Sequence, residues 1–132
     1  MPSPAAKSSR RSNCPIACTL DLLGDRWTLL LVRDLVAGKS RYGEFLESSE
    51  RIPTNILAER LQRLEAAGII TSTPYQENPP RWAYTLTPKG EDLKPALGAM
   101  AQWAMHHLPK VAPHPLLLPL FAGKAGPARR EK

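Results

Sequence analysis

The sequence lacks a long apolar run, and this absence excludes a membrane-spanning helix. No segment approaches the ~20 consecutive apolar residues that a span requires. The basic first segment, MPSPAAKSSRRSN, is not followed by a long apolar stretch, so it does not have the pattern of a signal peptide. We therefore expect a soluble cytoplasmic protein with no membrane partner, and 132 residues suffice for one domain with a modest core.

Cysteine is scarce, which excludes a fold held together by disulfides. Cys14 and Cys18 are the only cysteines, and a bridge between them across one helical turn would be strained. Two interpretations of Cys14 stay open. Either it is a small buried apolar residue, or it is a redox switch whose thiolate is favoured by the basic residues before it and by a nearby helix start.

The motifs of common enzymes and metal sites are also missing. The sequence has no Gly-rich phosphate loop, no nucleophile elbow and no recognisable Ser/His/Asp arrangement. His106 and His107 would point about 100° apart on a helix, and no cysteine or carboxylate stands at ligand spacing from them. We expect neither enzymatic activity nor a bound metal or cofactor.

The middle of the chain lacks an excess of positive charge, although the whole sequence has a net charge of +6. Residues 1–13 carry a charge of +3 and the residues after Leu108 carry +4, whereas the segment between them holds 10 basic and 11 acidic residues. The high pI is therefore a property of the two ends. By itself it is a poor argument for DNA binding.

The spacing of apolar residues predicts four helices in the first half of the chain. They are expected in CPIACTLDLLG, which stops at Gly24; in RWTLLLVRDLVAG, capped by Asp25; in SRYGEFLES, capped by Ser40; and in RIPTNILAERLQRLEAAGII. The second of these is apolar almost all round, apart from Arg26, Arg33 and Asp34. Such a helix is typical of the buried centre of a small domain.

After Gly68 the apolar period changes from that of a helix to that of a strand. IITSTPYQ and RWAYTLT have the pattern of two strands, and ENPP between them predicts a hairpin with its tip near residues 78–81. Thr87 followed by Pro88 is a helix-start signal. The last helix carries apolar residues at helical spacing, and Pro95 is expected to kink it or to delay its regular start.

This order of elements predicts a mainly α protein with a small β-hairpin. It is a winged helix-turn-helix with added N- and C-terminal dimerisation helices, in which the hairpin forms the wing. We expect the domain at residues 14–108, between a disordered basic arm at 1–13 and a Pro-rich basic tail at 109–132. The last helix has more apolar surface than one small domain can cover, which indicates a partner chain.

The helix that begins after Arg51 has an apolar and a polar face. Its core stripe is Leu57, Leu61 and Leu64. The other face starts with short or hydrogen-bonding side chains, which suit base edges because recognition helices read bases with their N-terminal residues. These candidate base-reading residues are Thr54, Asn55, Ala58 and Glu59. In the alternative interpretation, Thr54 and Asn55 only cap the helix and Glu59 is a solvated charge.

Four arginines around this helix have different expected roles. Arg51 and Arg63 are placed to clamp phosphates. Arg81 follows two prolines at the hairpin tip, which suits a contact in the minor groove or with a phosphate. Arg60 lies toward the core side of the helix, so we expect a structural role in which its head pairs with an acidic residue.

Four segments together resemble the HxlR family of bacterial winged-helix transcription regulators: CPIACTLDLLGDRWTLLLVRDL, RYGEFLESSERIPTNILAERLQRLEAAGII, PPRWAYTLTPKG and LKPALGAMAQWA. The resemblance runs from about Cys14 to Leu108. It implies a recognition helix in the major groove, a wing along the neighbouring groove, and a homodimer joined by the first and last helices. Arg26 stands where many members have Lys, and Pro53 where many have Ser.

The resemblance also implies candidate residues for the dimer interface and for sensing. The interface residues are expected to be Leu20, Leu97, Met100, Trp103 and Ala104. Cys14 matches an N-terminal cysteine that some members use to sense oxidants or electrophiles, so an oxidant or small-molecule inducer of unknown identity belongs to the same hypothesis. The prediction is a homodimeric transcription regulator that binds double-stranded DNA at a near-palindromic operator. The alternative is a winged-helix protein-interaction module without specific DNA binding.

Overall fold

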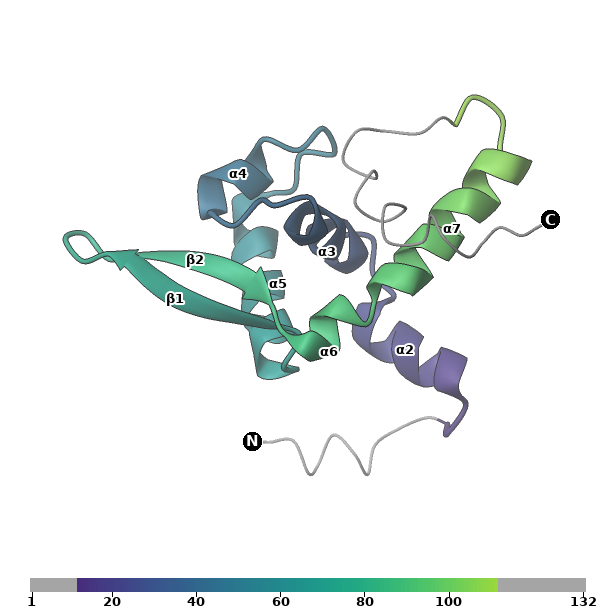
Figure 1. The fold of residues 1–132 in the computed structure, drawn as a ribbon, viewed down its shortest axis with the longest axis horizontal. Helices are drawn as coiled ribbons and strands as arrows, with labels where there is room; N and C mark the ends of the chain where they lie inside the picture. Colours follow the sequence, from purple (N-terminus) through teal and green to yellow (C-terminus); the bar gives the residue numbers. More distant parts are fainter. Residues whose placement is uncertain (1–11, 112–132) are drawn as a thin grey trace.

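The computed structural model describes residues 12–111, and these form six helices and one hairpin (Figure 1). The elements in chain order are α2 (Pro15–Leu23), α3 (Thr28–Val36), α4 (Tyr42–Leu46), α5 (Thr54–Ala66), β1 (Ile70–Gln76), β2 (Arg81–Leu86), α6 (Pro88–Glu91) and α7 (Lys94–His107). The predicted fold class, mainly helical with a two-stranded wing, is confirmed. Most of the predicted arm and tail lie outside the described residues, and the predicted domain limits stay predictions.

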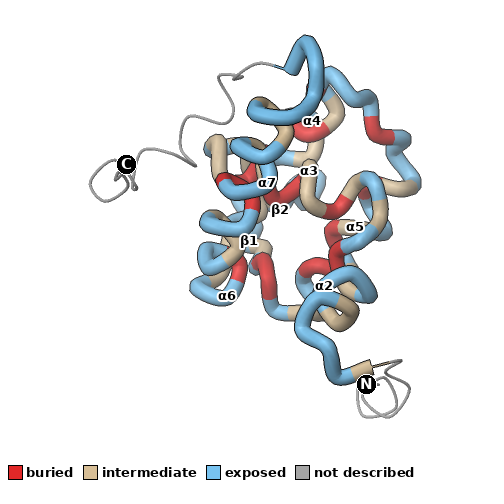
Figure 2. Tube along the Cα trace, turned by 90° about the vertical axis from the view of Figure 1, so that its right-hand side faces the viewer, coloured by how far each residue is buried: buried red, intermediate tan, exposed pale blue. Residues whose placement is uncertain are grey.

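Helix α3 lies at the centre of the molecule, with α4, α5 and the hairpin on one side of it and α7 on the other (Figure 1). Helices α2 and α7 lie at the end opposite the hairpin tip. Burial is concentrated where these elements meet α3 (Figure 2). The core residues include Leu23, Leu31, Val32, Phe45, Leu57, Leu61, Leu64, Ile69, Ile70 and Leu97. No helix in the described part of the chain is long and apolar enough to cross a membrane.

The predicted apolar stripe of α5 is confirmed, because Leu57, Leu61 and Leu64 are almost completely buried. Full burial of a leucine side chain stabilises a fold by about 1.5–3 kcal/mol. The same stripe leaves the opposite face of α5 in solvent, including Asn55 and Ala58. The packing of α5 therefore exposes the face on which the base-reading residues were predicted.

The starts of α3 and α4 differ from the sequence prediction. Helix α3 begins at Thr28, and the carboxylate of Asp25 in the turn before it accepts the amide hydrogens of Trp27 and Thr28 at 3.0 and 3.2 Å. Ser40 does not cap α4. Its carbonyl accepts the amide hydrogen of Tyr84 in the wing at 2.8 Å, and Glu44 accepts its amide hydrogen.

Neither Thr54 nor Asn55 caps α5, so the capping part of the alternative interpretation is wrong. The N-cap residue is Pro53, and no side chain accepts a capping hydrogen bond there. Pro95 delays the last helix as predicted, because a separate turn, α6, precedes α7. Thr87 caps α6 by accepting the amide hydrogen of Gly90 at 3.2 Å.

The hairpin is antiparallel and joins the helix-turn-helix through its second strand. Its register pairs Ile70 with Leu86, and the pairing becomes irregular near the tip. The amide of Tyr84 binds the chain just before α4, and the Tyr84 ring lies 6.3 Å from that of Phe45. These contacts fix the base of the wing on the helical core.

Gly90 provides a test of how closely α6 packs on the wing. A Cβ atom at this position would lie 2.3 Å from the carbonyl oxygen of Ile69 and 2.9 Å from a methyl group of Leu86. We expect Gly90→Ala to lower the free energy of unfolding by about 1–3 kcal/mol, measured by urea denaturation. Gly43→Ala is the matched control, because nothing lies within 4 Å of its added Cβ, and it should stabilise α4 by up to ~1 kcal/mol. Equal effects of the two substitutions would contradict this packing.

Candidate DNA-binding interface

The start of α5 is held against α4 and is open to solvent. The phenol of Tyr42 donates a hydrogen bond of 2.8 Å to the carbonyl oxygen of Thr54, which links the two helices at their entry points. All four predicted base-reading residues, Thr54, Asn55, Ala58 and Glu59, are exposed. A helix presented in this way by a second, shorter helix has the geometry that lets a recognition helix enter the major groove.

Arginines stand before α5, on α5 and at the start of β2 in the wing. Arg51 precedes α5 and Arg81 opens β2 at the end of the hairpin, and both are exposed. The guanidinium of Arg63 is held loosely, with one nitrogen 3.5 Å from a carboxylate oxygen of Glu59 and another 3.8 Å from one of Asp25. Because such exposed pairs contribute little free energy, Arg63 can exchange these contacts for a phosphate.

Among the base-reading candidates, Glu59 has ion-pair partners that the sequence did not predict. Its carboxylate contacts the guanidinium of Arg60 as well as that of Arg63. The hydrogen bond from Arg60 lowers the pKa of Glu59, so the side chain stays ionised and acts only as an acceptor. In that state it can accept a hydrogen bond from cytosine N4 only if at least one arginine moves aside.

Arg60 has the structural role that the sequence predicted. Its Nε donates a hydrogen bond of 2.8 Å to Asp25, in the loop that leads into α3. Burial alone would raise the pKa of Asp25, but hydrogen bonds from Thr28 and Arg60 outweigh this effect and lower it well below the usual range. The ionised Asp25 therefore ties the middle of α5 to the start of α3.

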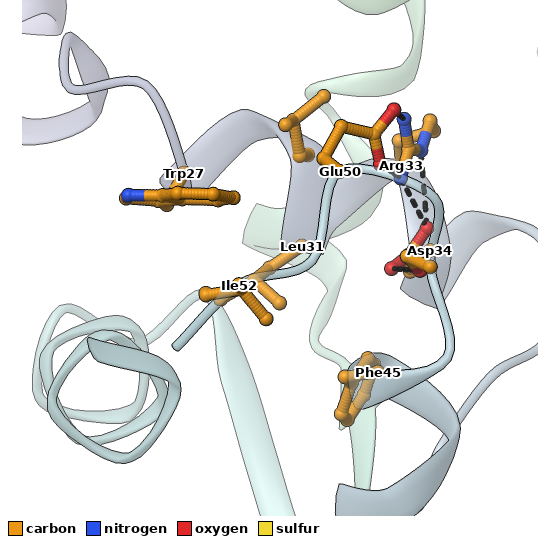
Figure 3. Close-up of a pocket in the computed structure, with 9 residues that line it drawn as sticks. Trp27, Leu31, Arg33, Asp34, Phe45, Glu50 and Ile52 are labelled. Atoms are coloured by element: carbon orange, nitrogen blue, oxygen red, sulfur yellow. Dashed lines mark hydrogen bonds and ion pairs between the residues drawn. The ribbon is translucent and has the colours of Figure 1, made fainter. Parts of the chain in front are cut away.

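A second polar cluster, which we call the turn clamp, ties the turn before α5 to α3. It consists of Arg33, Asp34, Ser48 and Glu50, and Figure 3 shows the Arg33 guanidinium between the carboxylates of Glu50 and Asp34. The hydrogen bonds from Arg33 lower the pKa of Glu50 to about 2. Sequence reasoning missed this cluster. The available signal was the pair of adjacent charges, Arg33 and Asp34, in an otherwise apolar helix.

Arg41 is a further cation that sequence reasoning missed. It is the N-cap residue of α4, and its guanidinium lies 4.0 Å from the centre of the Tyr75 ring in β1. It therefore stands at the junction of the helix-turn-helix and the wing. Beside it, a groove of about 270 Å³ runs between α4 and the hairpin, lined by Tyr42, Gly43, Tyr75, Pro80, Arg81, Trp82 and Tyr84. No sequence pattern predicted this meeting, because Arg41 and Tyr75 are far apart along the chain.

A model of the HxlR-like helix-turn-helix family matches residues 22–112, which include α3, α5, the hairpin and α7. The chain belongs to this family. The curated HTH-type transcriptional regulator sll1512 of Synechocystis is 41% identical over 87 residues, covering 66% of this chain and 64% of that protein. The chain thus matches less than two thirds of the length of this relative.

Solved structures of similar proteins share the fold. The crystal structure of PA1607 superposes with a TM-score of 0.70 at 38% identity, covering 81% of this chain and 75% of that one. The redox regulator HypR in its oxidised form superposes with a TM-score of 0.65 at 34% identity, covering 71% of this chain and 97% of HypR. The similarity therefore includes the helix-turn-helix and the wing together.

The first and last helices of this HxlR-like chain expose apolar side chains. Trp103 is 60% exposed, Leu20 56% and Met100 54%. Exposed apolar side chains that gather in one patch are typical of an interaction surface. Ala104 is half-buried. Leu97, the fifth residue predicted for the interface, is only 8% exposed and packs in the core of its own chain.

Cys14 is exposed, so it is not the buried apolar residue that one interpretation of the sequence predicted. It occupies the N-cap position of α2, and its thiol is free. Cys18 is half-buried, and its thiol donates a hydrogen bond of 3.3 Å to the carbonyl oxygen of Ser12. Within residues 12–111, no three His, Cys, Asp or Glu side chains form a group that could hold a metal ion.

Proposed function

We propose that this chain is a homodimeric transcription regulator that binds double-stranded DNA at a near-palindromic operator. The observation that carries the proposal is the exposed N-terminal face of α5, held on three buried leucines beside a wing that ends in Arg81. Among the described residues, Arg81 has no ion-pair partner, so its charge is available to DNA. The membership of the HxlR-like family supports the same function.

Base readout is assigned to the first turns of α5. Asn55 is exposed and can bind adenine N6 and N7 in a bidentate manner, and Thr54 can bond a base or contact a thymine methyl group. Ala58 offers a small apolar surface, and Glu59 offers an acceptor for cytosine N4. These contacts carry sequence information, which the phosphate contacts do not.

Affinity is assigned to the arginines around α5. Arg51 precedes α5, Arg63 lies on α5 itself, and Arg81 would reach the neighbouring groove from the wing. Each phosphate contact releases condensed counterions, so the binding constant falls as salt rises. Residues 14–108 have almost no net charge, and specificity is therefore expected to come from a few placed side chains.

Dimerisation is assigned to α2 and α7, whose exposed apolar side chains include Leu20, Met100 and Trp103. These helices lie away from the wing, so a partner chain on them would leave α5 free (Figure 1). A twofold arrangement would present two α5 helices about one DNA turn, ~34 Å, apart. This spacing explains why a near-palindromic operator is expected.

A pair of substitutions tests the division between readout and affinity. Asn55→Ala should lower the discrimination between operator and unrelated DNA by about 1–3 kcal/mol, because one bidentate base contact is lost. Arg63→Ala should weaken binding to all sequences and reduce the slope of log K against log salt by about one. Both effects are measured by fluorescence anisotropy with labelled duplexes. Equal effects of the two substitutions on every sequence would contradict this division of roles.

Cys14 supports a second element of the proposal, which is release of DNA on oxidation. Its thiol is exposed at the N-cap of α2, and the similar protein HypR is a redox regulator. The Cys14 thiolate would attack one oxygen of hydrogen peroxide and break the O–O bond, giving a sulfenic acid and releasing hydroxide. We expect peroxide to weaken operator binding by the chain and by Cys18→Ser, but not by Cys14→Ser. If Cys14→Ser responds to peroxide as the unmodified chain does, Cys14 is not the sensor.

A further inference from the structure

The turn that leads into α5 has apolar anchors only at its two ends. Phe45 in α4 and Ile52 just before α5 are buried, whereas Glu47, Ser49, Glu50 and Arg51 between them are exposed. Ser48 is the one buried residue within the turn, and it is polar. The path of this turn therefore depends on polar contacts, and the turn clamp supplies them (Figure 3).

Arg33 gives the turn clamp a defined geometry. Its Nη2 donates hydrogen bonds to Asp34 at 2.8 Å and to Glu50 at 2.9 Å, while its Nη1 donates to the second carboxylate oxygen of Glu50 at 2.9 Å. A planar guanidinium that binds a carboxylate with two parallel hydrogen bonds fixes both its distance and its orientation. Glu50 is therefore held in one position relative to α3.

Asp34 holds Ser48 on the buried side of the turn clamp. Its side chain is almost completely buried, and its Oδ2 accepts a hydrogen bond of 2.6 Å from the hydroxyl of Ser48. The ammonium group of Lys39 donates a further hydrogen bond to this hydroxyl at 2.8 Å. Charged groups that are partly removed from water contribute little net stability compared with apolar ones, so the best-supported use of the turn clamp is to define a single arrangement.

Arg51, the residue that follows Glu50 in the turn, carries backbone strain. Arg51 has a φ of +60°, in the left-handed region that costs an L residue about 1–2 kcal/mol. Its amide donates a hydrogen bond of 3.0 Å to the carbonyl oxygen of Ser48. Arg51 lies between Glu50, which the turn clamp holds, and the buried Ile52. These two neighbours keep the Arg51 backbone in a conformation that is unfavourable for an isolated L residue.

We propose that the turn clamp sets the position of the first turn of α5, so that Arg33, Asp34, Ser48 and Glu50 govern discrimination among DNA sites without contacting DNA. This inference rests on the proposed function, since discrimination requires that α5 reads bases. The four residues are positioning residues that act through the placement of Thr54 and Asn55. A binding constellation must be held to within ~0.5 Å, so a small shift of this turn is enough to lose a base contact.

The test compares two clamp variants with a matched control from the same turn. Glu50→Gln removes the charge that Arg33 binds, and Arg33→Lys keeps the positive charge but loses the planar fork. Glu47→Gln makes the same change of charge at an exposed residue outside the turn clamp. Binding of each variant to an operator selected from random DNA and to a scrambled duplex is measured over a range of salt concentrations.

We expect both clamp variants to lower the ratio of operator to scrambled affinity by about tenfold, the size of one lost base contact. Affinity for the scrambled duplex and its salt slope should be the same for Glu50→Gln as for Glu47→Gln, and the same for Arg33→Lys as for the unmodified chain. A general loss of folding would weaken both duplexes alike, and that result would overturn the inference. Full discrimination by Arg33→Lys would also overturn it, because charge alone would then suffice.

A measurement without DNA reports on the turn itself. Hydrogen exchange of the Arg51 and Leu57 amides, which bind the carbonyl oxygens of Ser48 and Pro53, should be about tenfold faster in both clamp variants. The amide of Ile69, bound to Leu64 at the far end of α5, serves as the internal reference and should not change. Unchanged exchange at Arg51 and Leu57 would overturn the inference.

Asn55→Ala separates the failure of this inference from failure of the proposed function. If Asn55→Ala loses discrimination and the two clamp variants do not, α5 reads DNA and the inferred role of the turn clamp is wrong. If none of the three variants loses discrimination, α5 does not read DNA. That outcome overturns the proposed function and, with it, the inferred role of the turn clamp.

Discussion

The position of α5 on α3 is the constraint on which the rest of the structure depends. The apolar contact of Leu57, Leu61 and Leu64 with the core supplies most of the attraction, but such contacts have little directional preference. Two polar ties supply direction: Asp25 binds Arg60 near the middle of α5, and Glu50 binds Arg33 before its start. Together they fix which face of α5 is presented to solvent and at what angle.

The molecule separates its two candidate surfaces. The start of α5 and the wing lie at one end, whereas the exposed apolar residues of α2 and α7 lie at the other (Figure 1). A partner chain can therefore cover Trp103 without burying Asn55. Cys14 stands at the start of α2, so a chemical change at its thiol would be felt first at the proposed dimer contact and only indirectly at α5.

Local signals in the sequence predicted most of the fold. The apolar period of α5, the change of period after Gly68 and the Thr87–Pro88 signal are all confirmed, because each depends on neighbouring residues. The helical angle of Arg60 also predicted its structural role. The prediction that Ser40 caps α4 is wrong: the N-cap residue is Arg41, and the carbonyl of Ser40 accepts a hydrogen bond from the wing across more than forty residues.

In the candidate site, too, features set by neighbouring residues could be predicted and contacts between distant residues could not. The exposed face of α5 could be predicted from periodicity, but the partners of Glu59 could not, since side-chain choice among several nearby charges is settled by packing. The turn clamp and the contact of Arg41 with Tyr75 join residues that are distant in sequence. The adjacent charges of Arg33 and Asp34 in an apolar helix were the only sequence signal of the turn clamp. The contact of Arg41 with Tyr75 had no sequence signal.

The central claim is that two copies of α5 read DNA together. Selection of binding sites from a random pool of duplex DNA, followed by sequencing, tests it most directly. The account predicts an enriched inverted repeat whose half-sites are centred about one DNA turn, ~10 base pairs, apart. Recovery of no enriched sequence, or of a single half-site without a repeat, would contradict it.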